Sequence, residues 1–187
     1  GRTQDKKVYK AGKKGLFENG KLIVLIDEGS ASASEIVSGA VQDWDRGLIV
    51  GRRSFGKGLV QESFQLSDNS ALRLTVSRYY TPTGRCIQKP YDKGYDAYQM
   101  DIMERYDHSE FYVEDSVKVE DSLVYLTPRG RKVYGGGGIK PDVFVAADSS
   151  LRNPIIEAVF RSGLLIRFCY SYVDNNRKEL KKYNDIN

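Results

Sequence analysis

A serine at the start of a predicted helix and a lysine between two glycines are the side chains best suited to acyl-transfer chemistry. Ser32 lies in the run GSASASE, directly after an apolar run, and Lys57 lies in FGKG. Unpaired backbone N–H groups at a helix N-terminus favour the negative charge that develops when a serine attacks a carbonyl. A lysine takes the serine proton only when neutral, so its pKa must fall from ~10.4 towards 7–8. Gln61, on the same face of an extended segment, is placed to orient the amine.

Each of these residues also has an ordinary structural reading. The pattern Ser32-x-x-Glu35 is a capping box, in which the serine and the glutamate satisfy N–H groups at a helix start. Most surface lysines are solvated and stay charged, and Lys57 is open to that reading too. The residue types and their spacing are therefore compatible with a Ser–Lys pair but do not establish one.

Other catalytic groups are scarce in this sequence. His108 is the only histidine and lies in a polar, acidic stretch, which argues against His-based metal sites and against a Ser–His–Asp triad. The two cysteines, Cys86 and Cys169, are too far apart for the ligand spacing of a zinc site. They can pair only in an oxidising compartment, and the sequence leaves that open. We expect no metal and no cofactor.

The composition is that of a globular protein, with 40% hydrophobic and 29% charged residues in 187. The net charge of +4 is mild and spread along the chain, and no nucleic-acid-binding module is recognisable, so we expect no nucleic-acid partner. No apolar run approaches the ~20 residues that span a bilayer. The chain begins at Gly1, so we expect a piece of a longer precursor, and the lack of a signal peptide decides nothing about its compartment.

The elements around Ser32 form a βαβ pattern. Residues 22–27 (LIVLID) predict a strand buried on both faces. A helix should follow from Ser34 to about residues 45–47, because its apolar side chains recur at helical spacing at Ile36, Val37, Ala40, Val41 and Trp44. Residues 48–50 predict a second strand. Strand, helix and strand within about thirty residues indicate an at least partly parallel sheet.

The rest of the chain predicts a hairpin, an insertion and a helical end. Residues 59–66 and 71–80 read as antiparallel strands around the turn SDNS. Residues 88–132 are charged and tyrosine-rich, and we interpret them as an insertion with one helix near residues 98–106. A short strand is expected at residues 143–145. We therefore expect two parts in this chain. The first covers residues 1–150 and begins with a loose polar stretch. The second is a helical segment over residues 151–187 that ends in a Lys/Asn-rich tail.

These segments together resemble the carboxyl-terminal processing proteases, also called tail-specific proteases. The matching stretches are GSASASEIVSGA (29–40), Asp43, GRRSFGKGLVQ (51–61), ALRLT (71–75), YTPTGR (80–85) and GIKPD (138–142). They occur in the family's order, and the resemblance covers roughly residues 22–145.

The resemblance implies roles for individual residues. The family's nucleophile falls on Ser32, its general base on Lys57 and the lysine-supporting glutamine on Gln61. The backbone N–H of Ala33 is implied as one oxyanion donor. An acidic residue that matters in some members falls on Asp43, although an aspartate near a helix end facing Arg46 also has a structural explanation.

The resemblance also implies an α/β fold of the Clp protease/crotonase type, a mixed sheet with flanking helices. The implied activity is that of a serine endopeptidase that cleaves protein or peptide substrates near unstructured C-terminal tails. The implied place of action is extracytoplasmic, either periplasmic or membrane-associated.

Three departures from the family pattern limit what this chain is expected to do alone. The upstream half of the catalytic domain, with the glycine-rich segment that gives the second oxyanion donor, lies outside these residues, and so does the peptide-binding PDZ domain. Residues 88–132 lengthen the connection between the TPTGR and GIKPD segments, which is usually short in the family. Loss of one oxyanion donor typically lowers the rate 10²–10³-fold, so we expect the isolated fragment to have little or no activity. Because one half of a shared sheet leaves an open edge, we also expect the fragment to self-associate.

Other functions remain open. A non-catalytic peptide-binding or scaffolding relative would share the fold, although the intact Ser32, Lys57 and Gln61 argue against it. A crotonase-type enzyme acting on thioesters would need acidic catalysts rather than a Ser–Lys pair. Nucleic-acid binding is the most distant alternative.

Overall fold

The computed structural model describes residues 8–116, 123–149 and 153–180. The first seven residues of the polar start and the last seven of the C-terminal tail lie outside the described residues. The chain divides into two compact units, residues 1–147 and 148–187. In the first unit the elements are β1 (Ile23–Ile26), α1 (Ala33–Asp43), β2 (Leu48–Gly51), β3 (Leu59–Gln65), β4 (Ala71–Arg78), α2 (Gly94–Asp107), η1 (Glu114–Ser116), β5 (Val124–Leu126), β6 (Lys132–Tyr134) and β7 (Val143–Phe144).

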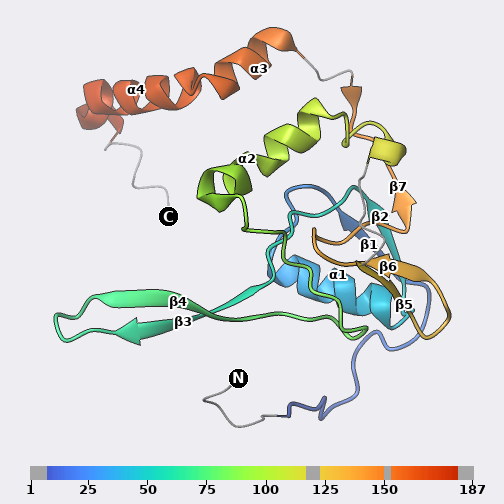
Figure 1. Cartoon of the computed structure of the whole chain (residues 1–187). Helices are drawn as coiled ribbons and strands as arrows, with labels where there is room; N and C mark the ends of the chain where they lie inside the picture. Colours follow the sequence, from blue (N-terminus) through green and yellow to red (C-terminus); the bar gives the residue numbers. More distant parts are fainter. Residues whose placement is uncertain (1–7, 117–122, 150–152, 181–187) are drawn as a thin grey trace. The chain divides into compact units, whose positions relative to one another are not determined.

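The first unit is a mixed α/β structure built on a three-stranded parallel sheet in the order β1-β2-β7 (Figure 1). Val24 of β1 lies opposite Ile49 of β2, and Val50 lies opposite Val143 of β7. The predicted parallel βαβ unit is confirmed, because α1 connects β1 to β2. The strand predicted at residues 143–145 is also confirmed as β7.

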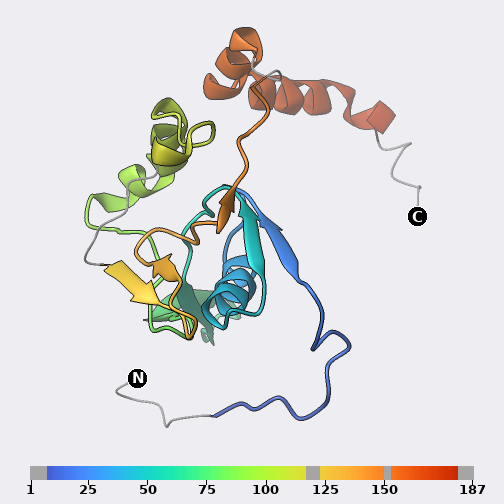
Figure 2. The ribbon, with the colours of Figure 1, turned by 90° about the vertical axis from the view of Figure 1, so that its right-hand side faces the viewer.

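Helix α1 lies beside this sheet (Figure 2), and both elements contribute side chains to the hydrophobic core. Four isoleucines form its centre, and Val24, Val41 and Tyr79 pack against them as partly buried residues. The central residues come from β1, β2, the segment after YTPTGR and the GIKPD segment: Ile26, Ile49, Ile87 and Ile139. Burial of a side chain of this size stabilises the fold by roughly 1.5–3 kcal/mol.

The prediction that the first strand is buried on both faces is wrong for this chain. Successive side chains of a strand point to opposite faces, so Val24 and Ile26 face the core while Ile23 and Leu25 point away from it. Ile23 is 60% exposed and Leu25 76% exposed. Within the described residues, that face of the sheet is left open to solvent.

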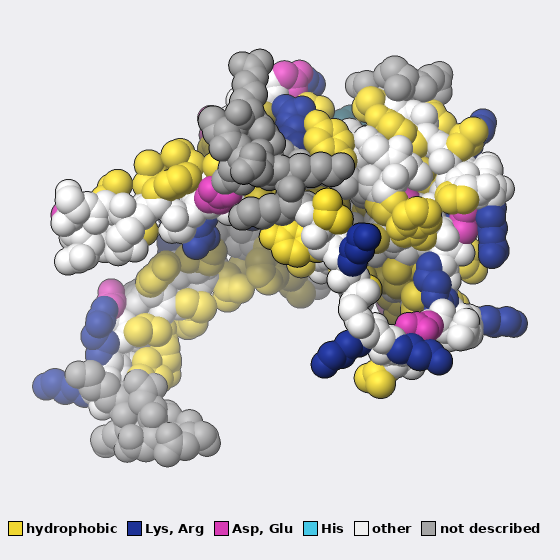
Figure 3. Space-filling model, turned by 90° about the horizontal axis from the view of Figure 1, so that it is seen from below, with side chains coloured by type: hydrophobic (Ala, Val, Ile, Leu, Met, Phe, Trp, Pro, Cys, Tyr) yellow, Lys and Arg dark blue, Asp and Glu magenta, His cyan; other side chains and the backbone are white. Residues whose placement is uncertain are grey.

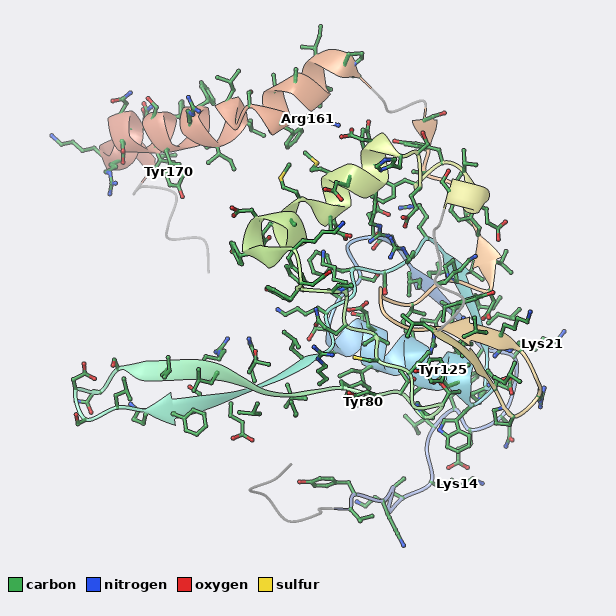
Figure 4. All side chains as sticks on the ribbon, viewed as in Figure 1. Lys14, Lys21, Tyr80, Tyr125, Arg161 and Tyr170 are labelled. Carbon is green, nitrogen blue, oxygen red and sulfur yellow. The ribbon has the colours of Figure 1, made fainter. Side chains whose placement is uncertain are left out.

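The predicted hairpin is confirmed: β3 and β4 pair antiparallel around the turn SDNS, with Phe64 opposite Leu72. All eight residues of β4 are exposed, including the predicted apolar row Leu72, Leu74 and Val76. Apolar side chains therefore appear on the molecular surface among the charged ones (Figure 3). After β4, Tyr80, which is labelled in Figure 4, forms an isolated bridge with Cys86 across the TPTG turn.

Residues 88–132 contain the expected helix, α2, which begins four residues earlier than predicted. This segment also contributes β5, which pairs with β6 as a small antiparallel sheet that the sequence analysis missed. Strands of three residues are too short to give a periodic signal in the sequence. Several polar residues of the segment are buried, which is unusual for a peripheral insertion: Gln88, Lys89, Arg105, Glu110 and Thr127.

The second unit consists of α3 (Pro154–Arg161) and α4 (Leu164–Leu180), so helices are present where the sequence predicts them. The Asn153 side chain accepts hydrogen bonds from the backbone N–H groups of Ile155 and Ile156 and caps α3. Cys86, in the first unit, and Cys169, on α4, are both free thiols. Over the described residues, no helix is both long enough and apolar enough to cross a bilayer.

Candidate active site

Ser32 occupies the turn between β1 and α1 in a strained backbone conformation. Its φ is 58° and its ψ is −115°, and a positive φ is uncommon for a residue with a Cβ. Such strain is concentrated at functional sites, and a serine on a sharp strand-to-helix turn presents its hydroxyl outward. Ser32 is exposed, and Ala33 is the first residue of α1, where N–H groups have no intrahelical partner.

Glu35 is the buried centre of this site. Its side chain is fully buried, and its two carboxylate oxygens accept four hydrogen bonds. Oε2 accepts the backbone N–H groups of Ser32 at 2.9 Å and Lys57 at 2.7 Å. Oε1 accepts the Ser54 hydroxyl at 2.5 Å and the Gly56 N–H at 2.6 Å. One carboxylate thus holds the backbones of the serine turn and the lysine segment together.

The glycines beside Lys57 are required by close packing. Gly56 has a φ of 91°, and a Cβ there would lie 3.1 Å from the Lys89 Cβ. A Cβ at Gly58 would lie 2.6 Å from Ile87 Cγ1. The backbone on both sides of Lys57 is also hydrogen-bonded: Gly56 O accepts the Lys89 N–H at 3.0 Å, and the Gly58 N–H donates to Gln88 Oε1 at 2.9 Å.

The backbones meet, but the side chains of the predicted pair do not. The Lys57 side chain is exposed, and no hydrogen bond joins it to the Ser32 hydroxyl among the described residues. Gln61 is also exposed, and its amide donates to the Thr75 hydroxyl at 3.4 Å rather than to Lys57. The arrangement therefore fixes the Lys57 backbone close to that of Ser32 and leaves the Lys57 side chain in solvent.

Asp43 contacts different residues from those expected. The interpretation that it faces Arg46 is wrong: Arg46 donates to the carbonyls of Gly20 and Phe17. Asp43 instead accepts two hydrogen bonds from the Arg85 guanidinium, at 3.0 and 2.7 Å, and both side chains are fully buried. It also accepts the N–H and hydroxyl of Thr83, so it anchors the TPTGR segment to the end of α1.

The surroundings of Asp43 favour its ionised form. Burial by itself raises the pKa of Asp43, but hydrogen bonds from Thr81 and Thr83 and the Arg85 charge outweigh it, and the pKa lies below its usual value. Burial lowers the pKa of Arg85, and the Asp43 charge opposes that effect. Since Asp43 ends α1 and Ser32 precedes its start, they are separated by about 16 Å of helix. Asp43 is placed to support the fold rather than the serine.

We predict that Glu35→Gln lowers the free energy of unfolding by about 3 kcal/mol or more, because an amide offers one acceptor oxygen where the carboxylate offers two. Its NH₂ group would face two of the four donors that Glu35 now satisfies. Urea unfolding followed by circular dichroism measures the change. Glu28→Gln, which weakens a half-buried ion pair with Arg52, is the control and should cost about 1 kcal/mol or less. A Glu35→Gln protein as stable as the Glu28→Gln control would contradict this role.

Glu35 is the residue of this site that the sequence analysis assigned only to helix capping. The signal was the Ser32-x-x-Glu35 spacing, and the Glu35 carboxylate does accept the Ser32 N–H as a capping box requires. Its three other donors lie nineteen or more residues away in the sequence, at Ser54, Gly56 and Lys57. Local spacing could not identify these partners.

Comparisons with known proteins agree with these motifs. A model of peptidase family S41 matches residues 1–95. The carboxy-terminal-processing protease of Bartonella bacilliformis is 58% identical over 73 residues, which cover 39% of this chain and 17% of that protein. The chloroplastic C-terminal processing peptidase of Tetradesmus obliquus is 48% identical over 82 residues, 44% of this chain and 18% of that protein. The match to this chain thus spans less than a fifth of the length of these relatives.

Among solved structures, a photosystem II D1 C-terminal processing protease is 31% identical and covers 66% of this chain and 20% of its own, with a TM-score of 0.35. The assignment rests on the sequence matches rather than on this superposition. The family model covers 95 of the 187 residues, including the Ser32 turn, the Lys57 segment and YTPTGR. This chain therefore belongs to peptidase family S41, and the resemblance to carboxyl-terminal processing proteases is confirmed.

Proposed function

We propose that the protein containing this chain is a serine endopeptidase in which Ser32 is the nucleophile and Lys57 the general base. The observation that carries the proposal is the shared Glu35 carboxylate, which accepts the backbone N–H groups of both residues through one oxygen. Two segments 25 residues apart are thereby held at one point. The exposure of Ser32 and its strained turn agree with a nucleophile that must reach a substrate.

In the proposed first step, neutral Lys57 accepts the Ser32 hydroxyl proton while the serine oxygen attacks a peptide carbonyl carbon. The tetrahedral oxyanion is stabilised by the Ala33 N–H, aided by the positive end of the α1 dipole. The ammonium of Lys57 then donates its proton to the leaving amine as the C–N bond breaks. An acyl-enzyme on Ser32 remains.

In the second step, Lys57 accepts a proton from water, and the hydroxide attacks the acyl carbon. The ester bond to Ser32 breaks, the serine oxygen regains its proton from Lys57, and the carboxylate product leaves. Gln61 is proposed to orient the amine once substrate is bound, since hydrogen bonds absent from a free site can form in the complex. The second oxyanion donor is proposed to come from outside this chain.

We further propose that the whole protein has the Clp protease/crotonase-type fold, cleaves near unstructured C-terminal tails and acts outside the cytoplasm. The support is the family membership and the relatives named C-terminal processing peptidases, one of them chloroplastic. Self-association is also proposed, and the exposed apolar residues of β1 and the β3–β4 hairpin support it.

The test is cleavage of an unstructured protein with a free C-terminus by the full-length protein and by its Ser32→Ala variant. We predict that Ser32→Ala cleaves at least about 10⁴-fold more slowly, because the acyl-enzyme can no longer form. Ser34→Ala is the matched control, since Ser34 is an exposed serine two residues away on α1. It should cleave like the wild type.

Three results would overturn the proposal. A Ser32→Ala protein that cleaves like the wild type would make Ser32 a helix cap only. A wild-type protein that binds the unstructured substrate but never cleaves it would favour the peptide-binding scaffold. Cleavage of a thioester but of no peptide would favour the crotonase-type alternative.

A further inference from the structure

The buried arginine of α2, Arg105, binds the backbone just before the lysine segment. It is 4% exposed, and its guanidinium donates to the carbonyl oxygens of Ser54 at 3.0 Å and of Arg53 at 2.6 Å. A guanidinium is a planar fork that can bind two neighbouring acceptors at once. Arg105 thus connects the segment at residues 88–132, which departs from the family pattern, to the backbone three residues before Lys57.

Glu110 fixes Arg105 from its other side. The Glu110 carboxylate accepts Arg105 Nε at 2.9 Å and the Arg53 guanidinium at 2.8 and 2.7 Å. Glu110 is 5% exposed, so these charges lie largely out of water. The Glu110 carboxylate therefore fixes both guanidinium groups by charge-assisted hydrogen bonds.

A second connection runs from α2 to the same backbone through Lys89. The Lys89 ammonium is 3.0 Å from Asp101 on α2, and it lies 4.0 Å from the centre of the Phe55 ring and 4.3 Å from that of Tyr98. Cation–π contacts of this kind are strongest where water is excluded, and Lys89 is 4% exposed. Together, Arg105 and Lys89 connect α2 to residues 53–56.

The bound backbone leads directly to the centre of the site. Ser54, whose carbonyl accepts Arg105, donates its hydroxyl to Glu35 at 2.5 Å. Gly56, whose carbonyl accepts the Lys89 N–H, donates its own N–H to Glu35 at 2.6 Å. Any shift of residues 53–56 therefore moves the backbone of Lys57 relative to Ser32.

We propose that Arg105 is a positioning residue for the peptidase reaction: through the carbonyls of Arg53 and Ser54 it fixes the backbone from which Lys57 reaches Ser32. The proposal rests on the proposed Ser–Lys mechanism. It makes residues 88–132 a part of the catalytic framework rather than a peripheral insertion. A displacement of about 1 Å between reacting groups can lower a rate about 10²-fold, so a positioning residue can have a large effect without touching substrate.

The test compares Arg105→Gln with the wild type in the full-length protein, with kcat and KM determined separately. We predict a fall in kcat of about 100-fold with KM within threefold, because the lysine is displaced while the substrate contacts remain. Amide hydrogen exchange of the peptide spanning residues 54–58 should be at least about tenfold faster than in the wild type. Arg105→Lys keeps the positive charge but loses the planar guanidinium that binds two carbonyls at once. If Arg105→Gln folds poorly, we predict the same fall in kcat and the same faster exchange for Arg105→Lys.

Arg131→Gln is the matched control. Like Arg105, Arg131 combines ion pairing with a bond to the backbone: it pairs with the carboxylates of Asp45 and Asp142 and donates to the carbonyl of Gln42. These contacts are at the other end of α1, so this variant should lose stability while kcat per folded molecule and exchange at residues 54–58 stay unchanged.

The outcomes separate this inference from the proposed function. Suppose that the wild type cleaves the substrate and Ser32→Ala does not. If Arg105→Gln and Arg105→Lys then keep the wild-type kcat and the wild-type exchange at residues 54–58, the positioning role is wrong and the Ser–Lys mechanism stands. If the wild type does not cleave, the proposed function fails, and the exchange measurement alone decides whether Arg105 fixes residues 54–58. Equal acceleration of exchange in the Arg131→Gln control would also overturn the inference.

Discussion

Replacing Lys57 by alanine is expected to lower kcat at least about 10⁴-fold while leaving the free energy of unfolding within about 0.5 kcal/mol of the wild type. The activity falls because the proposed proton acceptor of the Ser32 hydroxyl is removed, while the Glu35 carboxylate stays occupied by its four hydrogen-bond donors. The stability is kept because the Lys57 side chain is exposed, and alanine retains the backbone N–H that donates to Glu35. Cleavage kinetics and urea unfolding of the same preparation measure both quantities.

Lys21→Ala is the control for the loss of a surface lysine. Lys21 is exposed, precedes β1 and has no place in the site (Figure 4). Its replacement should change neither activity nor stability. If Lys57→Ala cleaves within about tenfold of the wild type, Lys57 is a solvated lysine and the proposed mechanism is wrong.

The largest expected loss of stability comes from breaking the Asp43–Arg85 pair. We predict that Asp43→Ala lowers the free energy of unfolding by about 3–5 kcal/mol, because the fully buried Arg85 charge loses the carboxylate that is hydrogen-bonded to it. The TPTGR segment would also lose its two bonds from Thr83. Urea unfolding at neutral pH is the measurement.

A double variant separates the charge from the packing. Asp43→Leu combined with Arg85→Met removes both charges and should recover part of the loss, because apolar residues of similar volume can replace a buried ion pair. Asp43→Ala should also keep its activity per folded molecule, since Asp43 lies at the far end of α1 from Ser32. A large loss of kcat in a stably folded Asp43→Ala protein would instead give Asp43 a supporting role in catalysis.

Local patterns in the sequence were enough to predict most of the elements near the site. Short apolar runs indicated β1 and β2, helical spacing of apolar residues indicated α1, and alternation around a turn indicated the β3–β4 hairpin. The sequence also placed Ser32 in the turn between β1 and α1, and Lys57 in the glycine-flanked segment between β2 and β3. The structure adds why they meet, through hydrogen bonds to Glu35.

The buried face of α1 could not be predicted by hydrophobicity. Val37 is 58% exposed and Trp44 66% exposed, although both belong to the predicted apolar stripe. The buried positions are mostly polar: Glu35, Ser38, Gly39, Gln42 and Asp43. Polar groups can be buried when each finds a partner, and these partners come from distant segments. Gln42, for example, donates to the carbonyl of Lys140 and accepts from Arg85.

Partners from distant segments also explain why the buried polar residues within 88–132 were not predicted and why the predicted partner of Asp43 was wrong. Residues 88–132 look like a charged surface segment, but Arg105 and Glu110 are buried because Arg53 and the backbone near it bind them. Asp43 was assigned to Arg46, three residues away, whereas its partner Arg85 is 42 residues away. Spacing along the chain identifies local pairs and has no information about such contacts.

The central claim is that Ser32 is the nucleophile of a serine peptidase. Its most direct test is to treat the folded full-length protein with a serine-reactive fluorophosphonate and to locate the adduct by mass spectrometry. We predict one adduct, on Ser32, that is lost in Lys57→Ala and after denaturation, because only the folded pair activates the hydroxyl. Neighbouring Ser30, whose hydroxyl donates to Asp27, and Ser34 should remain unlabelled. Labelling of another serine, or of none while the protein cleaves its substrate, would contradict the account.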